Sequence, residues 1–468
     1  MPMTLSHSAD FFDSFVARTR EAVPDGELAH TWSCEALARG WRQSGLRPGD
    51  LVLLCMPNGK ELLHQFFGVL VAEGVPALLA PGTPAARLRD MCQAMGARAV
   101  GALRFPGDDL GAQAHRTIGR LQVAMLPPTP KPAAKPGEVV LLTSGTSGFA
   151  SGCVFDFDAL LLNGQRHADA IGQRADDVVL VNLPMYFSFA LVAQALASLT
   201  RGNRLVISGP PFSNAHYRKM LEDHEISISS LTPALVGSVL QSQASFLSLP
   251  RVLTIGGDAL APELVARLVH LRECRELYLT YGLTQAGPRV ATFAAHAEPP
   301  RRYASAGLPM EGTTVCLRPT ADDSGLNQLY VASATVMKRS IGRIEGRAQA
   351  GVTAPQTIAT GDIFEQDQEG YLYFRGRLSD CIIRQGEKVS LAGVRRVASQ
   401  LPHVVSARTV VIRHEDGSQD FDLELSVDSP AGERIDARKT LRSLLKRTEL
   451  PRRIHIQTSN EAGIHAYK

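Results

Sequence analysis

The sequence has little net charge, no long apolar run and no paired cysteines. Its 468 residues carry a formal net charge of +3, which is too small to indicate binding to nucleic acid or to a membrane surface. No apolar run approaches the roughly 20 residues that a transmembrane helix needs, and the first residues lack a charged-then-apolar leader. The seven cysteines form no C-x-x-C pair, which predicts reduced thiols. We therefore expect a soluble, cytoplasmic protein.

Apolar runs bounded by turn residues recur along most of the chain. Hydrophobic residues make up 44% and charged residues 20%, as in soluble globular proteins, and the length exceeds that of one ordinary core. The runs predict buried parallel strands, and helical patterns lie between them. They fall at 50–55, 75–80, 178–181, 205–208, 228–231, 252–255 and 277–281. The sequence therefore predicts an α/β fold with mostly parallel sheets.

Glycines and hydroxyl side chains follow the apolar run 139–142. They read, in order, Thr143, Ser144, Gly145, Thr146, Ser147 and Gly148. Glycines let backbone N–H groups turn toward an anion, and hydroxyls add donors for phosphate oxygens. A Walker loop would end in Gly-Lys-Ser/Thr and a dinucleotide loop would read G-x-G-x-x-G, and neither is present. On composition alone, an ordinary turn after a strand is the commoner interpretation.

Further motifs give this loop a family context. The loop resembles the signature loop of the adenylate-forming superfamily, which includes acyl-CoA synthetases, peptide-synthetase adenylation domains and luciferases. Other segments resemble that family's motifs in the same order: 50–58 (G-D-x-V…P-N), 256–259 (the adenine loop), 278–287 (Y-G-x-T-E), 305–309 (G-x-P), 360–362 (T-G-D) and 376–380 (G-R-x-D-D). The resemblance covers nearly the whole chain.

The resemblance implies two domains. Residues 1–375 would form a large domain that binds ATP and the acyl group, and 376–379 would be a hinge. Beyond about Gly325 the pattern changes to short strands with turns, and 380–468 reads as a small α+β unit, which the resemblance makes mobile.

The resemblance also assigns roles to single residues. The segment 143–148 would bind the β- and γ-phosphates of ATP, Thr284 the α-phosphate, and Asp362 both ribose hydroxyls. Arg377 would contact the ribose or a phosphate beside the hinge. Adenine would lie against Gly257, Asp258, Ala259, Tyr281 and Gly282. The implied reaction joins a carboxylic acid to AMP and passes it to CoA, an acyl carrier protein or an amine acceptor.

The acyl pocket would lie along 183–191. Phe187 and Phe189 favour an apolar or aromatic acid, although both are equally readable as ordinary core residues. Nothing in this segment resembles the Asp with which amino-acid-activating domains hold an α-amine, so we expect an acid without one.

Several positions depart from the family pattern. Ser151 and Ile464 stand where the family has lysines, and Ser379 replaces the hinge acid or lysine. Gln285 replaces the glutamate that binds magnesium, and a neutral amide holds a divalent cation less well. The lysine at the position of Ile464 bridges the carboxylate and the α-phosphate, and losing such a contact costs on the order of 3 kcal/mol. His465 is the candidate catalytic residue that would substitute for this lysine, with the terminal Lys468, four residues displaced, as the other candidate.

Three hypotheses follow. The first is an ATP-dependent ligase that uses ATP and a weakened Mg²⁺ site, with no nucleic acid or membrane partner. The second is a non-catalytic homologue that binds nucleotide or an acyl ligand. The third is an enzyme that starts from a ready-made acyl-AMP and carries out only the transfer.

Overall fold

The structure is a computed structural model, and it describes residues 8–21, 32–105, 110–128, 134–143, 151–209, 212–241, 250–271, 275–320, 326–342, 351–378, 381–384, 387–414, 419–427 and 436–458. The chain divides into two compact units. The first consists mainly of Met1–Val315 and Val331–Ile358, and the second of Cys316–Tyr330 and Ala359–Ala466. The boundaries drawn from the sequence, with a hinge at 376–379, stay a prediction.

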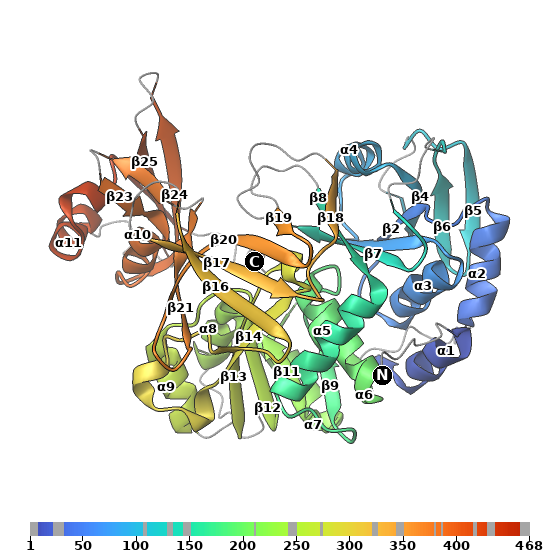
Figure 1. The fold of residues 1–468 in the computed structure, drawn as a ribbon, viewed down its shortest axis with the longest axis horizontal. Coiled ribbons are helices and arrows are strands. Elements are labelled where there is room, and N and C mark those ends of the chain that lie inside the picture. The colour runs from blue at the N-terminus through green and yellow to red at the C-terminus, as the bar shows by residue number, and fades with distance from the viewer. Residues whose placement is uncertain are drawn as a thin grey trace. The chain divides into compact units, whose positions relative to one another are not determined.

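The first unit contains two eight-stranded sheets (Figure 1). One has the order β18-β8-β7-β3-β2-β4-β6-β5. Its strands are β2 (Leu51–Cys55), β3 (Val75–Leu79), β4 (Ala97–Ala102), β5 (Ala114–Ile118), β6 (Leu121–Met125), β7 (Glu138–Thr143), β8 (Ser151–Asp156) and β18 (Arg339–Gly342). The centre, β7-β3-β2-β4, is parallel. Its strands β2 and β3 are fully apolar and buried, as is usual for parallel strands covered on both faces.

The other sheet has the order β1-β10-β9-β11-β12-β13-β14-β15. Its strands are β1 (Arg20–Glu21), β9 (Val178–Val181), β10 (Arg204–Ile207), β11 (Ile228–Leu231), β12 (Val252–Gly256), β13 (Glu276–Gly282), β14 (Arg289–Ala294) and β15 (Leu308–Pro309). Every pair from β1 to β13 is parallel, and β14 returns antiparallel to β13. The predicted apolar runs are therefore confirmed as strands.

Helices connect these strands. They are α1 (Ala9–Arg18), α2 (Cys34–Gln43), α3 (Lys60–Val71), α4 (Ala85–Met95), α5 (Phe157–Ala170), α6 (Ala197–Arg201), α7 (Asn214–Asp223), α8 (Pro233–Gln241) and α9 (Pro262–Leu271). A π-helical segment, η1 (Phe189–Leu196), runs directly into α6. Parallel neighbours such as β11 and β12 require crossovers of this kind.

The boundaries between the two units fall inside strands of a third sheet. Its strands are β16 (Thr313–Pro319), β17 (Asn327–Ser333), β19 (Gly351–Ala354), β20 (Thr357–Gln366) and β21 (Leu372–Arg377). The second unit continues with β22 (Cys381–Arg384), β23 (Glu387–Ser390), α10 (Leu391–Ala398), β24 (Val404–Arg413), β25 (Gln419–Val427), α11 (Ala437–Leu444) and β26 (Ile454–Thr458). Phe421, Leu423 and Leu441 are fully buried in its own core.

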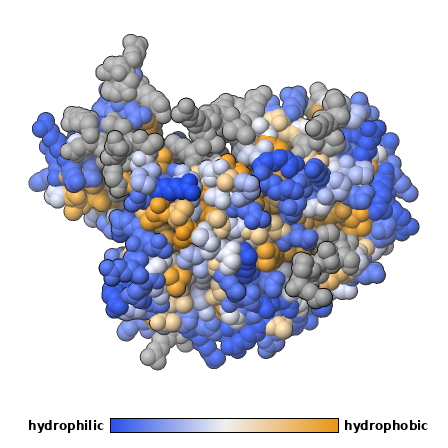
Figure 2. All heavy atoms as spheres, viewed as in Figure 1, coloured by the Kyte–Doolittle hydropathy of each residue, from blue (hydrophilic) through white to orange (hydrophobic). Residues whose placement is uncertain are grey.

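Four cysteines, Cys34, Cys55, Cys92 and Cys153, are free and buried, whereas Cys316 is free and exposed. The face shown in Figure 2 is mainly hydrophilic, with smaller groups of hydrophobic residues between. Among the described helices, none has the length and apolar character needed to cross a bilayer.

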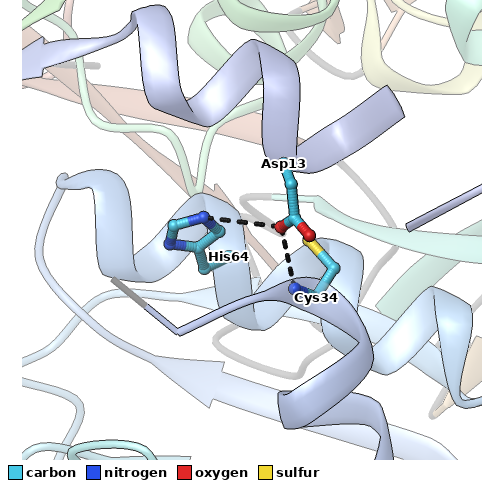
Figure 3. Close-up of side chains that lie close together, drawn as sticks. All are labelled: Asp13, Cys34 and His64. Carbon is cyan, nitrogen blue, oxygen red and sulfur yellow. Dashed lines mark hydrogen bonds and ion pairs between the residues drawn. The ribbon is translucent and has the colours of Figure 1, made fainter. Parts of the chain in front are cut away.

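A polar cluster joins the first three helices. Asp13 of α1 lies against Cys34 at the start of α2 and His64 of α3 (Figure 3). Oδ1 of Asp13 accepts a hydrogen bond from the backbone N–H of Cys34 at 2.8 Å and lies 3.8 Å from Nε2 of His64. Burial, and then Asp13, raises the pKa of the Cys34 thiol, and burial lowers the pKa of His64. Because the thiol and the imidazole are both neutral at pH 7, the cluster fits a hydrogen-bonded junction of three helices.

Candidate active site

The structure fixes the two ends of the expected phosphate-binding segment. β7 ends at Thr143 and β8 begins at Ser151, and these two residues pair in antiparallel register. The described ends on either side of the segment are therefore neighbouring ends of an antiparallel strand pair, the β7–β8 hairpin. Its members Ser144, Gly145, Thr146, Ser147 and Gly148 lie outside the described residues.

An ion-pair network holds the root of this hairpin. Glu138, the first residue of β7, is buried, and its carboxylate binds Arg339 of β18 at 2.8 Å and Lys338 at 2.9 Å. Lys338 also pairs with Asp156 at the end of β8. Burial alone would raise the pKa of Glu138, but hydrogen bonds from Arg339 and Lys338 lower it to about 2. Ion pairs thus connect the strands β7, β8 and β18 at the end of the hairpin remote from the phosphate segment.

The expected α-phosphate and adenine contacts lie on one short segment. Tyr281 and Gly282 end β13, and Thr284–Ala286 form a single 3-10 turn after it. Gly287 follows with φ of +101°, and a Cβ there would lie 2.2 Å from the carbonyl oxygen of Thr335. Only glycine fits at this point, which lets the turn pass close to Thr335 and enter β14.

Side chains distant in sequence hold this segment in place. Asn163 of α5 donates to the carbonyl of Arg289 and accepts from its backbone N–H, both at 2.9 Å. The Asn163 amide also donates to Oγ1 of Thr335 at 3.2 Å, and that hydroxyl donates to the carbonyl of Ala286 at 3.1 Å. Asn163 and Thr335 are buried. The sequence analysis missed both, because their partners lie 126 and 49 positions away and no local pattern marks them.

Thr284 contacts a residue of the expected acyl segment. Its Oγ1 lies 3.1 Å from Oγ of Ser188, the residue before η1. Phe189 is the first residue of η1. π-Helical segments are rare in proteins, and those that occur are often found at functional sites. Phe187 packs on Tyr186 with ring centroids 4.6 Å apart. The structure therefore brings the predicted phosphate contact and the predicted pocket segment together.

Asn58 positions the chain that leads into this pocket. Its Nδ2 donates to the carbonyl of Leu183 at 2.8 Å, and its Oδ1 accepts from the N–H of Met185 at 2.8 Å. Asn58 follows β2 in one sheet, whereas Leu183 follows β9 in the other. The P-N motif noted in the sequence thus has a physical role, since one amide fixes the pocket segment.

A buried cation lies against the pocket residue Phe189. The guanidinium carbon of Arg289 is 3.6 Å from the centroid of the Phe189 ring. Burial lowers the pKa of Arg289 to about 9, so the side chain remains charged at neutral pH. Burial, with the charge of Arg289, lowers the pKa of His167 to about 3, so this imidazole is neutral. The sequence analysis did not single out Arg289, although a cation opening the apolar strand 290–294 was a signal.

The expected adenine loop lies at the carboxyl end of β12. Gly257, Asp258 and Ala259 are all exposed, and Oδ1 of Asp258 accepts from the N–H of Ala259 at 2.8 Å. Ligands of open α/β sheets bind at this edge, so the placement agrees with a nucleotide role that remains a prediction.

Asp362 and Arg377 face each other on neighbouring strands of the second unit. They are paired in the register of β20 and β21, and Nε of Arg377 lies 3.2 Å from Oδ1 of Asp362. Thr360 supports the backbone of β20 at this point, since its hydroxyl accepts from the N–H of Asp362 at 3.1 Å and donates to the carbonyl of Leu329 at 2.8 Å. The carboxylate is buried and Arg377 is half exposed. Their predicted ribose and phosphate contacts stay predictions.

Gln285 is half-buried, and its carbonyl accepts from the N–H of Met337 at 2.9 Å. Its side chain offers a neutral amide oxygen at the predicted magnesium position. Ser379, Ile464 and His465 lie outside the described residues.

The fold and these motifs define a class of protein. Residues 31–339 match the family described as AMP-binding enzyme, and the chain belongs to this family. An indoleacetate–CoA ligase from Aromatoleum aromaticum is 28% identical over 58% of this chain and 54% of its own length. The chain thus spans about half of that relative. The long-chain-fatty-acid–CoA ligase FadD13 of Mycobacterium tuberculosis is also 28% identical, over 79% of this chain and 77% of its own.

Solved structures share the fold. The o-succinylbenzoate CoA synthetase MenE from Bacillus subtilis matches 91% of this chain and 88% of its own, with a TM-score of 0.74 at 19% identity. The amide bond synthetase McbA from Marinactinospora thermotolerans matches 96% of both chains, with a TM-score of 0.72 at 19% identity. The predicted α/β fold of the adenylate-forming superfamily is therefore confirmed.

Proposed function

We propose that this protein activates an apolar or aromatic carboxylic acid with ATP and transfers the acyl group to a thiol or an amine. The observation that carries the proposal is the contact between Thr284 and Ser188, because it joins the expected α-phosphate contact to the expected acyl segment. Relatives named as ligases of indoleacetate and of long-chain fatty acids support an apolar acid. The likeness to an amide bond synthetase is the reason that an amine is included as an acceptor beside a thiol.

The reaction has two halves. An oxygen of the acid attacks the α-phosphorus of ATP, the bond to the bridging oxygen of the β-phosphate breaks, and pyrophosphate leaves. The thiol or amine then attacks the acyl carbon and gives up its proton, and AMP leaves. Both first reactants are anionic, so donors must neutralise the charge as they approach. Thr284 would donate to the α-phosphate, and the buried Asp362 would accept from the ribose hydroxyls.

The expected magnesium position has two neutral oxygen donors that are adjacent in sequence. Thr284 offers a hydroxyl and Gln285 an amide oxygen, and Mg²⁺ accepts such oxygens beside those of phosphates. These residues fit a weak site, in which the triphosphate itself supplies most of the charge. A Bacillus subtilis MenE structure contains ATP and magnesium ion.

Pyrophosphate exchange into ATP over a panel of acids tests the proposal. We expect exchange with apolar or aromatic acids, and a loss of roughly tenfold or more in Thr284→Val, because a charged hydrogen bond is removed. Thr440→Val on α11 is the matched control and should leave the rate unchanged. If no acid supports exchange at high enzyme concentration, the protein does not adenylate acids.

The replaced lysines favour a second candidate, a homologue that binds nucleotide or acyl-AMP without the first half-reaction. Ser151 opens β8 directly after the phosphate segment and supplies no charge there. This candidate predicts AMP binding by calorimetry without exchange, and restored exchange in the double variant Ser151→Lys, Ile464→Lys. If acyl-AMP and a thiol yield thioester, the protein retains the transfer half.

A further inference from the structure

Arg289 is a buried cation with two side-chain nitrogens that find no hydrogen-bond partner in the described part of the chain. Its side chain is only 3% exposed, and Nε and Nη2 have no hydrogen-bond partner among the described residues. In that part of the chain no carboxylate forms an ion pair with it either. Buried charges are ordinarily paired, because an isolated ion loses its hydration without compensation. The missing partner therefore points to a ligand.

The neighbours of Arg289 do not replace this partner. One face of the guanidinium lies on the Phe189 ring, and a cation–π contact stabilises the charge without using its N–H donors. His167 is neutral, because burial and the nearby charge of Arg289 lower its pKa. Its Nδ1 also lacks a hydrogen-bond partner in the described chain. Nε and Nη2 of Arg289 and Nδ1 of His167 are thus three buried nitrogens without a hydrogen-bond partner among the described residues.

The unpaired atoms have the geometry of a carboxylate receptor. Nε and Nη2 lie on the same edge of the guanidinium, and this edge presents two parallel N–H groups to two oxygens. Arg452 uses the same edge in this protein, where its Nε and Nη2 donate to the two oxygens of Asp422 at 3.0 and 2.9 Å. The Arg289 edge is equivalent and lacks such an acceptor in the described chain.

Arg289 lies beside the carboxyl end of β12, next to the expected acyl segment. A Cβ on Gly256, the last residue of β12, would lie 2.5 Å from Oγ1 of Thr280 and 3.1 Å from both Nη1 of Arg289 and Cε1 of Phe189, so only glycine fits beside this guanidinium. The carboxyl end of a parallel sheet is where ligands bind in α/β proteins. Thr284 lies five positions before Arg289, and its partner Ser188 lies next to Phe189.

We propose that Arg289 binds a second carboxylate of the acid substrate, at the end remote from the carboxylate that is adenylated. The substrate class is thus a dicarboxylic acid whose apolar or aromatic body packs along the η1 segment. This inference rests on the proposed function, of which it specifies the acid. A nucleotide phosphate is the other anion at hand, but the expected phosphate contacts lie at 143–148 and Thr284.

Matched pairs of acids test the inference. In pyrophosphate exchange, isophthalate is compared with benzoate and adipate with hexanoate. We expect the wild type to prefer the dicarboxylic acid of each pair in kcat/KM by roughly ten- to a hundredfold, the value of a charged hydrogen-bonded pair. Arg289→Met should remove the preference, and Arg289→Lys should restore part of it. Equal rates within each pair for the wild type would overturn the proposal.

Two further measurements separate this inference from the proposed function. Calorimetry with isophthalate and with AMP does not depend on turnover. Arg289→Met should abolish binding of isophthalate and leave that of AMP unchanged; a loss confined to AMP would assign Arg289 to the nucleotide and overturn the proposal. If wild-type protein binds isophthalate but exchanges no acid, the proposed function fails and the Arg289 site stands.

Thermal melting without ligand supplies the structural control. Because Arg289 has no described ion-pair partner, Arg289→Met should melt at or above the wild-type temperature. The matched variant Arg251→Met removes a largely buried arginine that pairs with Asp177 and Glu276, and it should melt lower without changing acid preference. A drop in melting temperature for Arg289→Met equal to that of Arg251→Met would show a structural role instead.

Discussion

Glu138 and Arg339 are joined by two parallel hydrogen bonds, from Nη1 to Oε1 at 3.0 Å and from Nη2 to Oε2 at 2.8 Å. This bidentate pair spans 201 positions of sequence and ties β18 to the root of β7. Because β7 carries Thr143 at its other end, the pair fixes the strand on which the phosphate segment depends. Bidentate pairs of this kind are the geometrically most specific ion pairs.

Glu138→Gln should destabilise the first unit by about 2 kcal/mol, since it removes a buried charge from two cations that remain partly exposed. The effect depends on pH. The folded pKa of about 2 lies below the ordinary value of 4.5, so the unfolded carboxylate takes up its proton first as the pH falls. The stabilisation is complete above pH 4.5 and is lost toward pH 2. Urea denaturation of both proteins across this range should show the wild-type advantage shrinking; a constant difference would contradict it.

Thr335→Val should lower exchange activity by roughly ten- to a hundredfold, because the turn that carries Thr284 loses its tie to the Ala286 carbonyl and small displacements of reacting groups are costly. Thr335→Ser keeps the hydroxyl and is the matched control. The kcat and KM values of both variants decide the matter. Equal activity in Thr335→Val and wild type would mean that the turn holds its shape without this bond.

Asp362→Asn should raise KM for ATP by roughly tenfold and leave KM for the acid nearly unchanged, because an amide accepts less strongly than a carboxylate from hydroxyl donors. Glu365→Gln is the control on the same strand, since Glu365 pairs with Arg375 at the exposed surface. An acid-specific effect in Asp362→Asn would argue against the ribose role.

Asp13→Ala should destabilise the first unit by about 1 kcal/mol, because the N–H of Cys34 at the start of α2 loses its acceptor. Asp13→Asn retains an oxygen acceptor, so its stability should lie between those of the wild type and Asp13→Ala. Hydrogen exchange of the Cys34 amide reports the contact directly. Unchanged protection in Asp13→Ala would show that α2 does not depend on α1 at this point.

The fold was largely predictable because its signals are local. A strand buried on both faces, such as β2 or β3, must be apolar along its whole length, and turn residues mark where it stops. The positions of Thr284, Asp362 and Gly257 were likewise found from short motifs. Their roles are still predictions, because a motif gives position and not contact.

The parts that escaped prediction depend on tertiary contacts. Asn163 and Thr335 hold the Thr284 turn through partners far away in sequence, and either residue alone is an ordinary helix or loop residue. Arg289 is informative because no described carboxylate forms an ion pair with it. A sequence alone does not show which buried charges lack a partner. From the sequence, Phe189 was equally readable as an acyl-pocket residue or an ordinary core residue, and the contact of its ring with this guanidinium could not be foreseen.

The amide of Asn58 has a practical consequence for engineering. It connects the end of β2 to Leu183 and Met185, so the backbone in front of the pocket inherits its position from a separate sheet. Libraries that vary only residues lining the pocket would leave this control untouched. Selectivity can therefore drift through changes near positions 56–59, and such distant substitutions belong in any search for altered acid preference.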